Sequence, residues 1–235
     1  MNYKDLRDFV AFLESRGQLH RITIPVSCEL EMTEIADRMV KGGGPALLFE
    51  NVAGYDMPVL MNIFCSDRRM AWALGVEEID ELVTRLEGML QLAQGPSEGL
   101  MNKLRTLGQL IQVGRFQPKT VSRAPCQEVV LEGDAVDLFK FPVIKCWPMD
   151  GGRYITLPLV ITRDPVTGTQ NYGTYRMQVY DSCTTGMHWQ THKVGAHHYR
   201  LSQERQDNRL EVAVAIGADP ATMWTASAPP QPGNY

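Results

Sequence analysis

Residues 154–191 read YITLPLVITRDPVTGTQNYGTYRMQVYDSCTTGMHWQT, and this stretch decides the fold of the second half of the chain. Three runs rich in β-branched and aromatic residues, at residues 154–163, 171–180 and 187–191, are separated by two segments rich in Asp, Pro, Gly, Ser and Thr. Such segments favour tight turns, and the runs between them favour strands. The stretch therefore predicts an antiparallel β-meander.

The stretch from Tyr154 to His198, which contains the predicted meander, carries an unusual number of polar side chains, including Asn171, Arg176, His188, Gln190 and Lys193. A sheet in a globular protein normally has an apolar inner face. The excess indicates a site for a polar ligand on a β scaffold.

Hydrophobic periodicity predicts the elements on either side of the meander. Upstream, helices are expected at residues 5–16, 29–41, 68–74, 77–92 and 100–113, and strands at residues 19–26, 45–50 and 57–64. The remaining expected elements are strands at residues 127–131, 141–146 and 210–216 and a solvent-facing helix at residues 200–208. We therefore predict an α+β protein, in which an α/β layered unit precedes a small antiparallel barrel or sandwich.

Composition and charge exclude several classes of protein. The chain is 44% hydrophobic and 21% charged, as is usual for globular proteins. Its net charge of −4 and the absence of basic blocks argue against a nucleic-acid partner. No run is apolar enough for a membrane helix, and the N-terminus does not resemble a signal peptide. Five widely spaced cysteines fit reduced thiols, so we predict a cytoplasmic protein.

Gly173 lies between two informative polar residues, Asn171 and Arg176. On a regular strand these two side chains, five residues apart, point to opposite faces. A bulge at Gly173 would bring both to one face, and glycine in a strand often marks a bulge or a close approach of the backbone. Arg176 would then bind an anion, and Asn171 would offer an oxygen to a hard cation. The alternative is that Arg176 pairs with an acid and Asn171 caps a turn.

A histidine-rich segment follows. On a strand, His188, Gln190 and His192 share one face, which would suit a cation or a polar ligand, although a half-exposed strand end explains the same pattern. The adjacent pair His197 and His198 diverges and is expected at the surface. No dinucleotide-binding glycine motif, Walker loop, Cys-x-x-Cys or Gly-x-Ser-x-Gly elbow is present.

Residues 171–176, NYGTYR, resemble the Asn-x-Gly-x-Tyr-Arg signature of the UbiD-type decarboxylases. Further segments resemble blocks of that family in the same order: residues 6–9 (LRDF), 43–51 (GGPALLFEN), 124–127 (APCQ), 146–148 (CWP) and 217–222 (GADPAT). The likeness is greatest to the 3-polyprenyl-4-hydroxybenzoate decarboxylase branch.

This resemblance implies a fold and an activity. The fold is an N-terminal α/β layered domain at residues 1–118, followed at residues 119–235 by an incomplete FMN-binding split β-barrel. The activity is the reversible, non-oxidative decarboxylation of an aromatic or unsaturated acid of the 3-polyprenyl-4-hydroxybenzoate type, in the ubiquinone pathway. The implied cofactors are prenylated FMN and a divalent metal, manganese or magnesium.

The resemblance also implies roles for individual residues. Asn171 is expected to ligate the metal that bridges the flavin phosphate, and Arg176 to hold the substrate carboxylate as the catalytic residue. The residues expected to line the cofactor are Thr174, Tyr175, Arg176, His188, Trp189, Gln190, Lys193 and Val194. Some relatives have a metal-binding His near the position of His192, whose role here is left open.

The same family carries acidic residues that bind metal and transfer the proton, and then a C-terminal assembly domain, after the segment resembling residues 226–229. No acid follows Asp219 here, so we expect a chain truncated before these parts. The alternatives are a non-catalytic flavin-binding module and a truncated paralogue that needs a partner. The expected partners are the small aromatic acid, a flavin prenyltransferase that supplies the cofactor and, in full-length relatives, further copies of the chain; peripheral membrane contact is left open.

Overall fold

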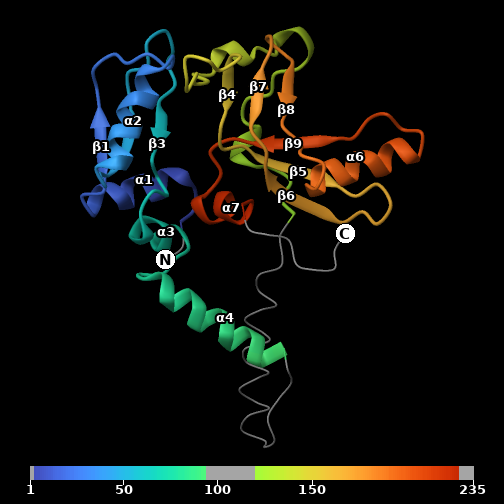
Figure 1. The fold of residues 1–235 in the computed structure, drawn as a ribbon, viewed down its shortest axis with the longest axis horizontal. Coiled ribbons are helices and arrows are strands. Elements are labelled where there is room, and N and C mark those ends of the chain that lie inside the picture. The colour runs from blue at the N-terminus through green and yellow to red at the C-terminus, as the bar shows by residue number, and fades with distance from the viewer. Residues whose placement is uncertain (1–2, 94–119, 228–235) are drawn as a thin grey trace, which may run out of the picture. The chain divides into compact units, whose positions relative to one another are not determined.

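The computed structural model describes residues 3–93 and 120–227 (Figure 1). They belong to two compact units, one formed by residues 1–77 together with 137–235 and the other by residues 78–136. The expected helix at residues 100–113 and the expected domain boundary at residues 118–119 lie outside the described residues. Within the described ranges, no helix is both long and apolar enough to cross a membrane.

The N-terminal part of the first unit alternates helices and strands as the periodicity predicts. Its elements are α1 (Leu6–Ser15), β1 (Leu19–Ile22), α2 (Glu31–Lys41), β2 (Ala46–Phe49), β3 (Val59–Met61) and α3 (Asp67–Ala73). The strands form one sheet in the order β1-β2-β3, in which β1 and β2 are parallel and β2 and β3 are antiparallel. Side-chain caps fix two helix starts, since Asp5 accepts from the first turn of α1 and Ser66 from that of α3.

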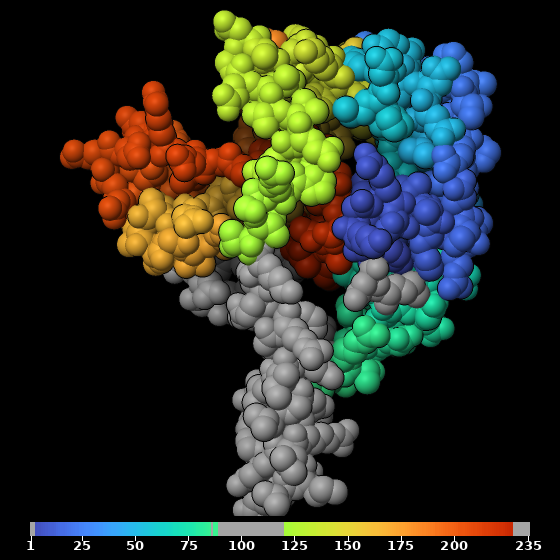
Figure 2. Space-filling view, turned by 180° about the vertical axis from the view of Figure 1, so that it is seen from behind, coloured from blue at the N-terminus to red at the C-terminus, as the bar shows by residue number. Residues whose placement is uncertain are grey.

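Two apolar clusters stabilise this part of the unit. In one, Met32 of α2 and Phe49 of β2 are fully buried together. In the other, Phe9 of α1 lies with Trp72 of α3 and with Met223 of α7 (Pro220–Thr225). Figure 2 shows the red α7 next to the blue N-terminal residues. Residues far apart in the sequence therefore share one core.

The β-rich part of the unit consists of two small antiparallel sheets (Figure 1). One has the order β4-β7-β8, with β4 (Arg153–Ile155), β7 (Met177–Val179) and β8 (Thr185–Met187). The other has the order β6-β5-β9, with β5 (Leu159–Arg163), β6 (Gln170–Thr174) and β9 (Val212–Ala215). The fold is thus mixed α/β with small open sheets.

The turns of the predicted meander are confirmed, but the expectation that its strands form one continuous sheet is wrong. Hairpins β5–β6 and β7–β8 form where the turns were expected. The run at residues 154–163 nevertheless divides at Pro158, which cannot donate a ladder hydrogen bond, and its two parts join different sheets. The run at residues 171–180 divides likewise after Thr174.

The predicted strand at residues 127–131 is wrong. A short 3₁₀ helix, Pro125–Gln127, begins there instead, with Pro125 at a position that a helix start tolerates. The strand expected at residues 141–146 is reduced to isolated bridges at Ile144 and Lys145.

The solvent-facing helix expected at residues 200–208 is α6 (Val194–Glu204), which begins earlier and buries one of its faces. His198 and Ser202 are both buried, so the expectation of a surface position for His198 is wrong. In the second unit, α4 (Ile79–Ala93) confirms the helix expected at residues 77–92.

Candidate functional site

The residues Tyr175 and Arg176 join the two sheets, because β6 ends at Thr174 and β7 begins at Met177. The β5–β6 ladder pairs Val160 with Gly173 and Leu159 with Thr174 in an uninterrupted register. The expected bulge at Gly173 is therefore wrong. The irregularity lies just beyond it, where the chain passes from one sheet to the other.

Gly173 instead permits a close approach of a side chain. A Cβ atom at this position would lie 2.5 Å from the hydroxyl oxygen of Tyr175 and 2.6 Å from its Cζ, which is closer than side chains tolerate. Tyr175 is buried, with 6% of its surface exposed. The absence of a side chain at Gly173 thus lets the Tyr175 ring fold back over β6.

The Tyr175 hydroxyl connects two elements. It accepts hydrogen bonds from Asn171 Nδ2 of β6 and from the backbone N–H of Gly195 in the first turn of α6, both at 3.3 Å. The amide nitrogen of Asn171 is thereby engaged, and its amide oxygen is the group left to bind a cation. A helix N-terminus has a partial positive charge and backbone donors, and such ends bind phosphate. Tyr175 thus brings the Asn171 amide and the N-terminus of α6 together.

Trp189 lies against the same ring. Its indole stands edge-on to Tyr175, with ring centroids 6.2 Å apart, and its centroid lies 6.0 Å from that of the tilted Tyr199 ring. A Cβ atom at Gly195 would lie 2.8 Å from Trp189 Nε1, so glycine is needed where α6 meets the indole. The indole N–H is buried and has no hydrogen-bond partner among the described residues. A buried donor without a partner is uncommon and leaves a hydrogen bond available to a ligand.

Arg176 is exposed, and its guanidinium carbon lies 5.4 Å from the centroid of the Tyr154 ring, within the range of a cation–π contact. No acid in residues 3–93 or 120–227 forms an ion pair with it. The alternative in which Arg176 pairs with an acid is therefore not realised in the described part of the chain. The guanidinium is held by an aromatic face and is free to bind an anion.

The histidine-rich segment is a loop between β8 and α6 rather than a strand. His188, Gln190, His192 and Lys193 are all exposed, so the expectation that alternate residues share a strand face is wrong. The backbone N–H of His188 donates to the carbonyl of Arg176, which places the loop beside the linker. No three His, Cys, Asp or Glu residues of the described chain are grouped as a metal site.

The two remaining expected cofactor residues, Val194 and Thr174, lie next to residues already described. Val194 is the first residue of α6, next to Gly195. Thr174 ends β6, and its N–H donates to the Ala226 carbonyl at 3.1 Å. Its hydroxyl lies 3.4 Å from that of Ser227. The structure thus joins Asn171, Tyr175 and Trp189 directly, with the other predicted positions around them.

A buried pair that the sequence did not predict fixes α6 on the sheet. His198 Nδ1 lies 3.0 Å from the Thr162 hydroxyl of β5. Burial lowers the pKa of His198, and the charge of Asp164 partly opposes this. The spacing of Gly195, His198 and Ser202, which are all buried, is that of one helix face. This spacing would have revealed the pair had the helix been predicted to start before residue 200.

Two protein-family models match the chain. The first, described as the 3-octaprenyl-4-hydroxybenzoate carboxy-lyase N-terminal domain, UbiD_N, matches residues 10–86. The second, described as the 3-octaprenyl-4-hydroxybenzoate carboxy-lyase Rift-related domain, UbiD, matches residues 119–234. Together they span most of the chain.

Among individual proteins, an uncharacterized protein of Archaeoglobus fulgidus is 53% identical over 229 residues, which are 97% of this chain and 46% of that protein. The solved vanillic acid decarboxylase of Sedimentibacter hydroxybenzoicus, in its closed form, is 28% identical with a TM-score of 0.78, over 97% of this chain and 46% of that one.

HmfF from Pelotomaculum thermopropionicum, a UbiD-class enzyme solved in complex with FMN, is 28% identical with a TM-score of 0.75, again over 97% of this chain and 46% of that one. An evolved dimeric form of it was solved with prFMN; it is 26% identical with a TM-score of 0.71, over 92% and 45% of the two chains. The chain spans about half the length of the curated relatives it matches.

Proposed function

This chain belongs to the UbiD family, of which it matches the N-terminal part, and from this premise we propose that it forms the cofactor-binding part of a decarboxylase. The reaction is the reversible, non-oxidative removal of carbon dioxide from an aromatic or unsaturated carboxylic acid. The similar structures include a vanillic acid decarboxylase and complexes of a UbiD-class enzyme with FMN and prFMN, which supports the reaction and the flavin.

The arrangement around Tyr175 is the observation that carries the proposal. Its hydroxyl accepts from both Asn171 and the N-terminus of α6, while the neighbouring indole N–H of Trp189 has no partner in the described chain. These groups suit a phosphate-bearing ring with a metal ion: the helix end and the indole donate to anionic or carbonyl oxygens, and the Asn171 oxygen binds the ion. The residues present therefore fit prenylated FMN and manganese or magnesium.

Each protein group then has a defined task. The cofactor, when bound, supplies an electron sink for the carbon that loses carbon dioxide. Arg176 holds the substrate carboxylate through charge-assisted hydrogen bonds. Buried Tyr175 and half-buried Trp189 exclude water from one side of the site. Thr174, His188, Gln190, Lys193 and Val194 line its edges. The proton that returns to the carbon comes from an acid, a role that we assign to none of the described residues.

Further features of the proposal come from the family resemblance. The substrate is of the 3-polyprenyl-4-hydroxybenzoate type, in ubiquinone biosynthesis, and a flavin prenyltransferase supplies the cofactor. Residues 1–118 form the N-terminal domain, and the two β-sheets belong to a split barrel within residues 119–235. The protein acts in the cytoplasm, and the whole enzyme is a homo-oligomer.

The test is co-expression of the chain with a flavin prenyltransferase, followed by mass spectrometry and absorbance of the bound flavin. We expect bound flavin in the parent chain and loss of it in Asn171→Ala and Tyr175→Phe. Tyr172→Phe is the matched control, because Tyr172 is exposed and its hydroxyl donates to Gln170 Oε1 and to no other group in the described part of the chain. Absence of flavin from the parent, with metal supplied, would refute the proposal.

A second candidate is a flavin-binding module without turnover, because the groups around Tyr175 suit a flavin and none of the described residues is assigned the proton transfer. Bound flavin combined with no release of labelled carbon dioxide from an aromatic acid would select this alternative.

A further inference from the structure

Three side chains on one face of the sheet β4-β7-β8 form a series of contacts that ends at Arg176. β4 and β7 are antiparallel, and Tyr154 lies directly opposite Gln178. Residues two apart on an extended chain share a face, so Arg176, two residues before Gln178, lies on the side of the Tyr154 ring. Tyr154 is thus the direct cross-strand neighbour of Gln178 and the diagonal neighbour of Arg176.

The Gln178 amide holds the Tyr154 ring at its hydroxyl end. The hydroxyl donates to Gln178 Oε1 at 2.9 Å, and both residues are half-buried. The amide has little room to turn, because a Cβ atom added at Gly151 or Gly152 would lie only 3.2 or 3.3 Å from Gln178 Nε2. The two glycines therefore let the backbone before β4 pack closely against the amide, and the amide orients the ring.

The guanidinium of Arg176 lies over the face of this ring, with its central carbon 5.4 Å from the ring centroid. At an exposed site, such a cation–π contact changes an equilibrium constant about two- to fivefold. The contact restricts a long side chain whose rotamer freedom is otherwise large. An acid could restrict the guanidinium as well, but its carboxylate would compete with any anion that binds there. The ring positions Arg176 and leaves its charge intact.

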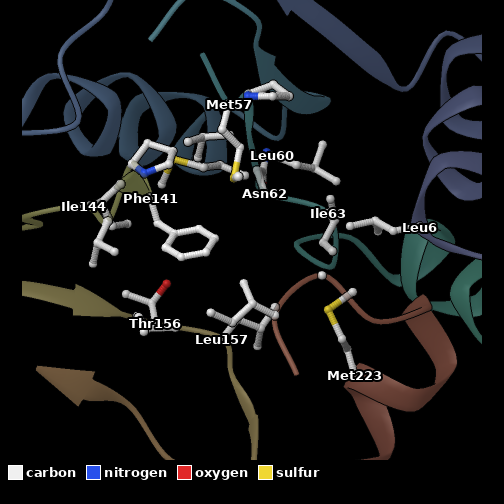
Figure 3. Close-up of a pocket in the computed structure, with 18 of the residues that line it drawn as sticks. Leu6, Met57, Leu60, Asn62, Ile63, Phe141, Ile144, Thr156, Leu157 and Met223 are labelled. Atoms are coloured by element: carbon white, nitrogen blue, oxygen red, sulfur yellow. The ribbon is translucent and has the colours of Figure 1, made fainter. Parts of the chain in front are cut away.

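The surroundings of Tyr154 supply no counter-charge to the guanidinium. Tyr154 also lines an apolar pocket of about 500 Å³, and Figure 3 shows the side chains of Leu60, Phe141 and Met223 around it. The lining residues are Leu6, residues 57–65, 141–144, 154–157 and 216–217, and Met223. Among these described residues there is no Asp, Glu, Lys, Arg or His, so the pocket offers Arg176 no acid as a partner.

We propose that Tyr154 and Gln178 are positioning residues, which fix the direction of the Arg176 guanidinium before an anion binds. The Gln178 amide orients the ring, and the ring orients the cation. A binding group that is already oriented loses less conformational entropy when its ligand arrives, and this raises the affinity. That the anion is the carboxylate of a substrate rests on the function proposed above; the positioning of the guanidinium does not.

Nuclear magnetic resonance of the chain with isotope-labelled arginine tests the positioning without any ligand. A proton above an aromatic ring is shielded, so the side-chain signals of Arg176 should lie upfield, and Arg176→Lys identifies them by their loss. Tyr154→Leu should abolish the upfield shift. Tyr154→Phe and Gln178→Leu both keep the ring but remove its hydrogen bond, so each should reduce the shift, and the double variant should reduce it no further. Tyr172→Leu, which removes an exposed tyrosine of β6, is the matched control and should leave the signals unchanged.

Titration of the same variants with benzoate measures the consequence for anion binding. Tyr154→Leu should weaken benzoate binding about two- to fivefold, which is the effect of an exposed cation–π contact. Tyr154→Phe and Gln178→Leu should weaken it less. Gln178→Glu keeps an acceptor for the Tyr154 hydroxyl but places a carboxylate on the face of Arg176, so it should weaken binding more than Gln178→Leu. A purely structural role of Gln178 would not produce this order, and thermal melts show which variants are folded.

Arg176 signals that are the same in folded Tyr154→Leu and in the parent overturn the proposal. If Tyr154→Leu does not fold, unchanged signals in both Tyr154→Phe and Gln178→Leu overturn it instead. Effects of these two variants that add in the double variant overturn the role of Gln178 as the group that orients the ring. A parent with shifted Arg176 signals that does not bind benzoate supports the positioning and overturns the carboxylate role of Arg176, so failure of the proposed function is distinguished from failure of this inference.

Discussion

Gly173→Ala is the substitution that most directly tests how the candidate site is built. The new methyl group would lie 2.5–2.7 Å from three atoms of the Tyr175 side chain. Carbon atoms in contact normally lie at about 3.5–4.0 Å, so the ring must retreat by about 1 Å. This retreat removes the ring from Asn171 Nδ2 and from the Gly195 N–H, which lie at 3.3 Å in the parent.

Gly173→Ala lowers the free energy of unfolding in two ways. Forcing one methyl group into a packed region costs about 1–3 kcal/mol. Each of the two hydrogen bonds contributes about 0.5–1.5 kcal/mol, and their length places them at the lower end of that range. We therefore expect Gly173→Ala to lower the free energy of unfolding by about 2–4 kcal/mol and to abolish flavin retention.

Urea denaturation of a double-mutant cycle provides the measurement. In a Tyr175→Ala background the ring is absent, and Gly173→Ala should then cost less than about 0.5 kcal/mol. Gly88→Ala serves as a control for glycine replacement, because its added Cβ meets nothing within 4 Å in the middle of α4; it should stabilise by about 0.5–1 kcal/mol. Equal costs of Gly173→Ala in the two backgrounds would refute the reasoning.

Three further predictions concern the first unit. Because burial lowers the pKa of His198 below its usual 6.5, the unfolded chain takes up a proton that the folded chain refuses, and stability should fall as the pH drops below 6.5. His198→Gln should flatten this dependence in thermal melts between pH 5 and pH 8, and an unchanged slope would contradict the assignment. Arg69 is 1% exposed and has two guanidinium nitrogens without partners in the described chain. Arg69→Met should therefore be more stable than Arg69→Lys, which keeps the buried charge, and the reverse order in urea denaturation would exclude this explanation. Phe9→Ala removes a fully buried ring and should cost about 3–5 kcal/mol, whereas a cost below about 1 kcal/mol would show that Phe9 is not a core residue.

The sequence predicted the N-terminal half of the first unit well because α1 and α2 are amphipathic and β2 is a short apolar strand. Helical spacing located α1 and α2 to within two residues at each end. The β-rich half was harder, since periodicity shows that a run is extended but not which sheet it joins. Pro158 was visible in the sequence, yet its effect depends on the second sheet that β5 enters.

The candidate site shows a similar division. Residue spacing suggested that Asn171 and Arg176 act together, but it predicted a bulge at Gly173, which is wrong. Gly173 instead makes room for the ring of Tyr175, two residues later, whose hydroxyl accepts a hydrogen bond from Asn171 only in the folded chain. The apolar pocket was not predicted at all, because Leu60 or Phe141 looks like any core residue until the space beside it is known.

The two-residue link between β6 and β7 has a consequence for how the site responds to its ligands. Tyr175 and Arg176 connect the two sheets through the backbone. Their side chains also make the contacts proposed for the cofactor and the substrate. A rotation of one sheet against the other changes the backbone torsion angles of Tyr175 and Arg176. A ligand bound to these two residues therefore opposes that rotation. Ligand binding and the relative orientation of the two sheets are consequently coupled, and a bound ligand is expected to restrict the motion of one sheet against the other.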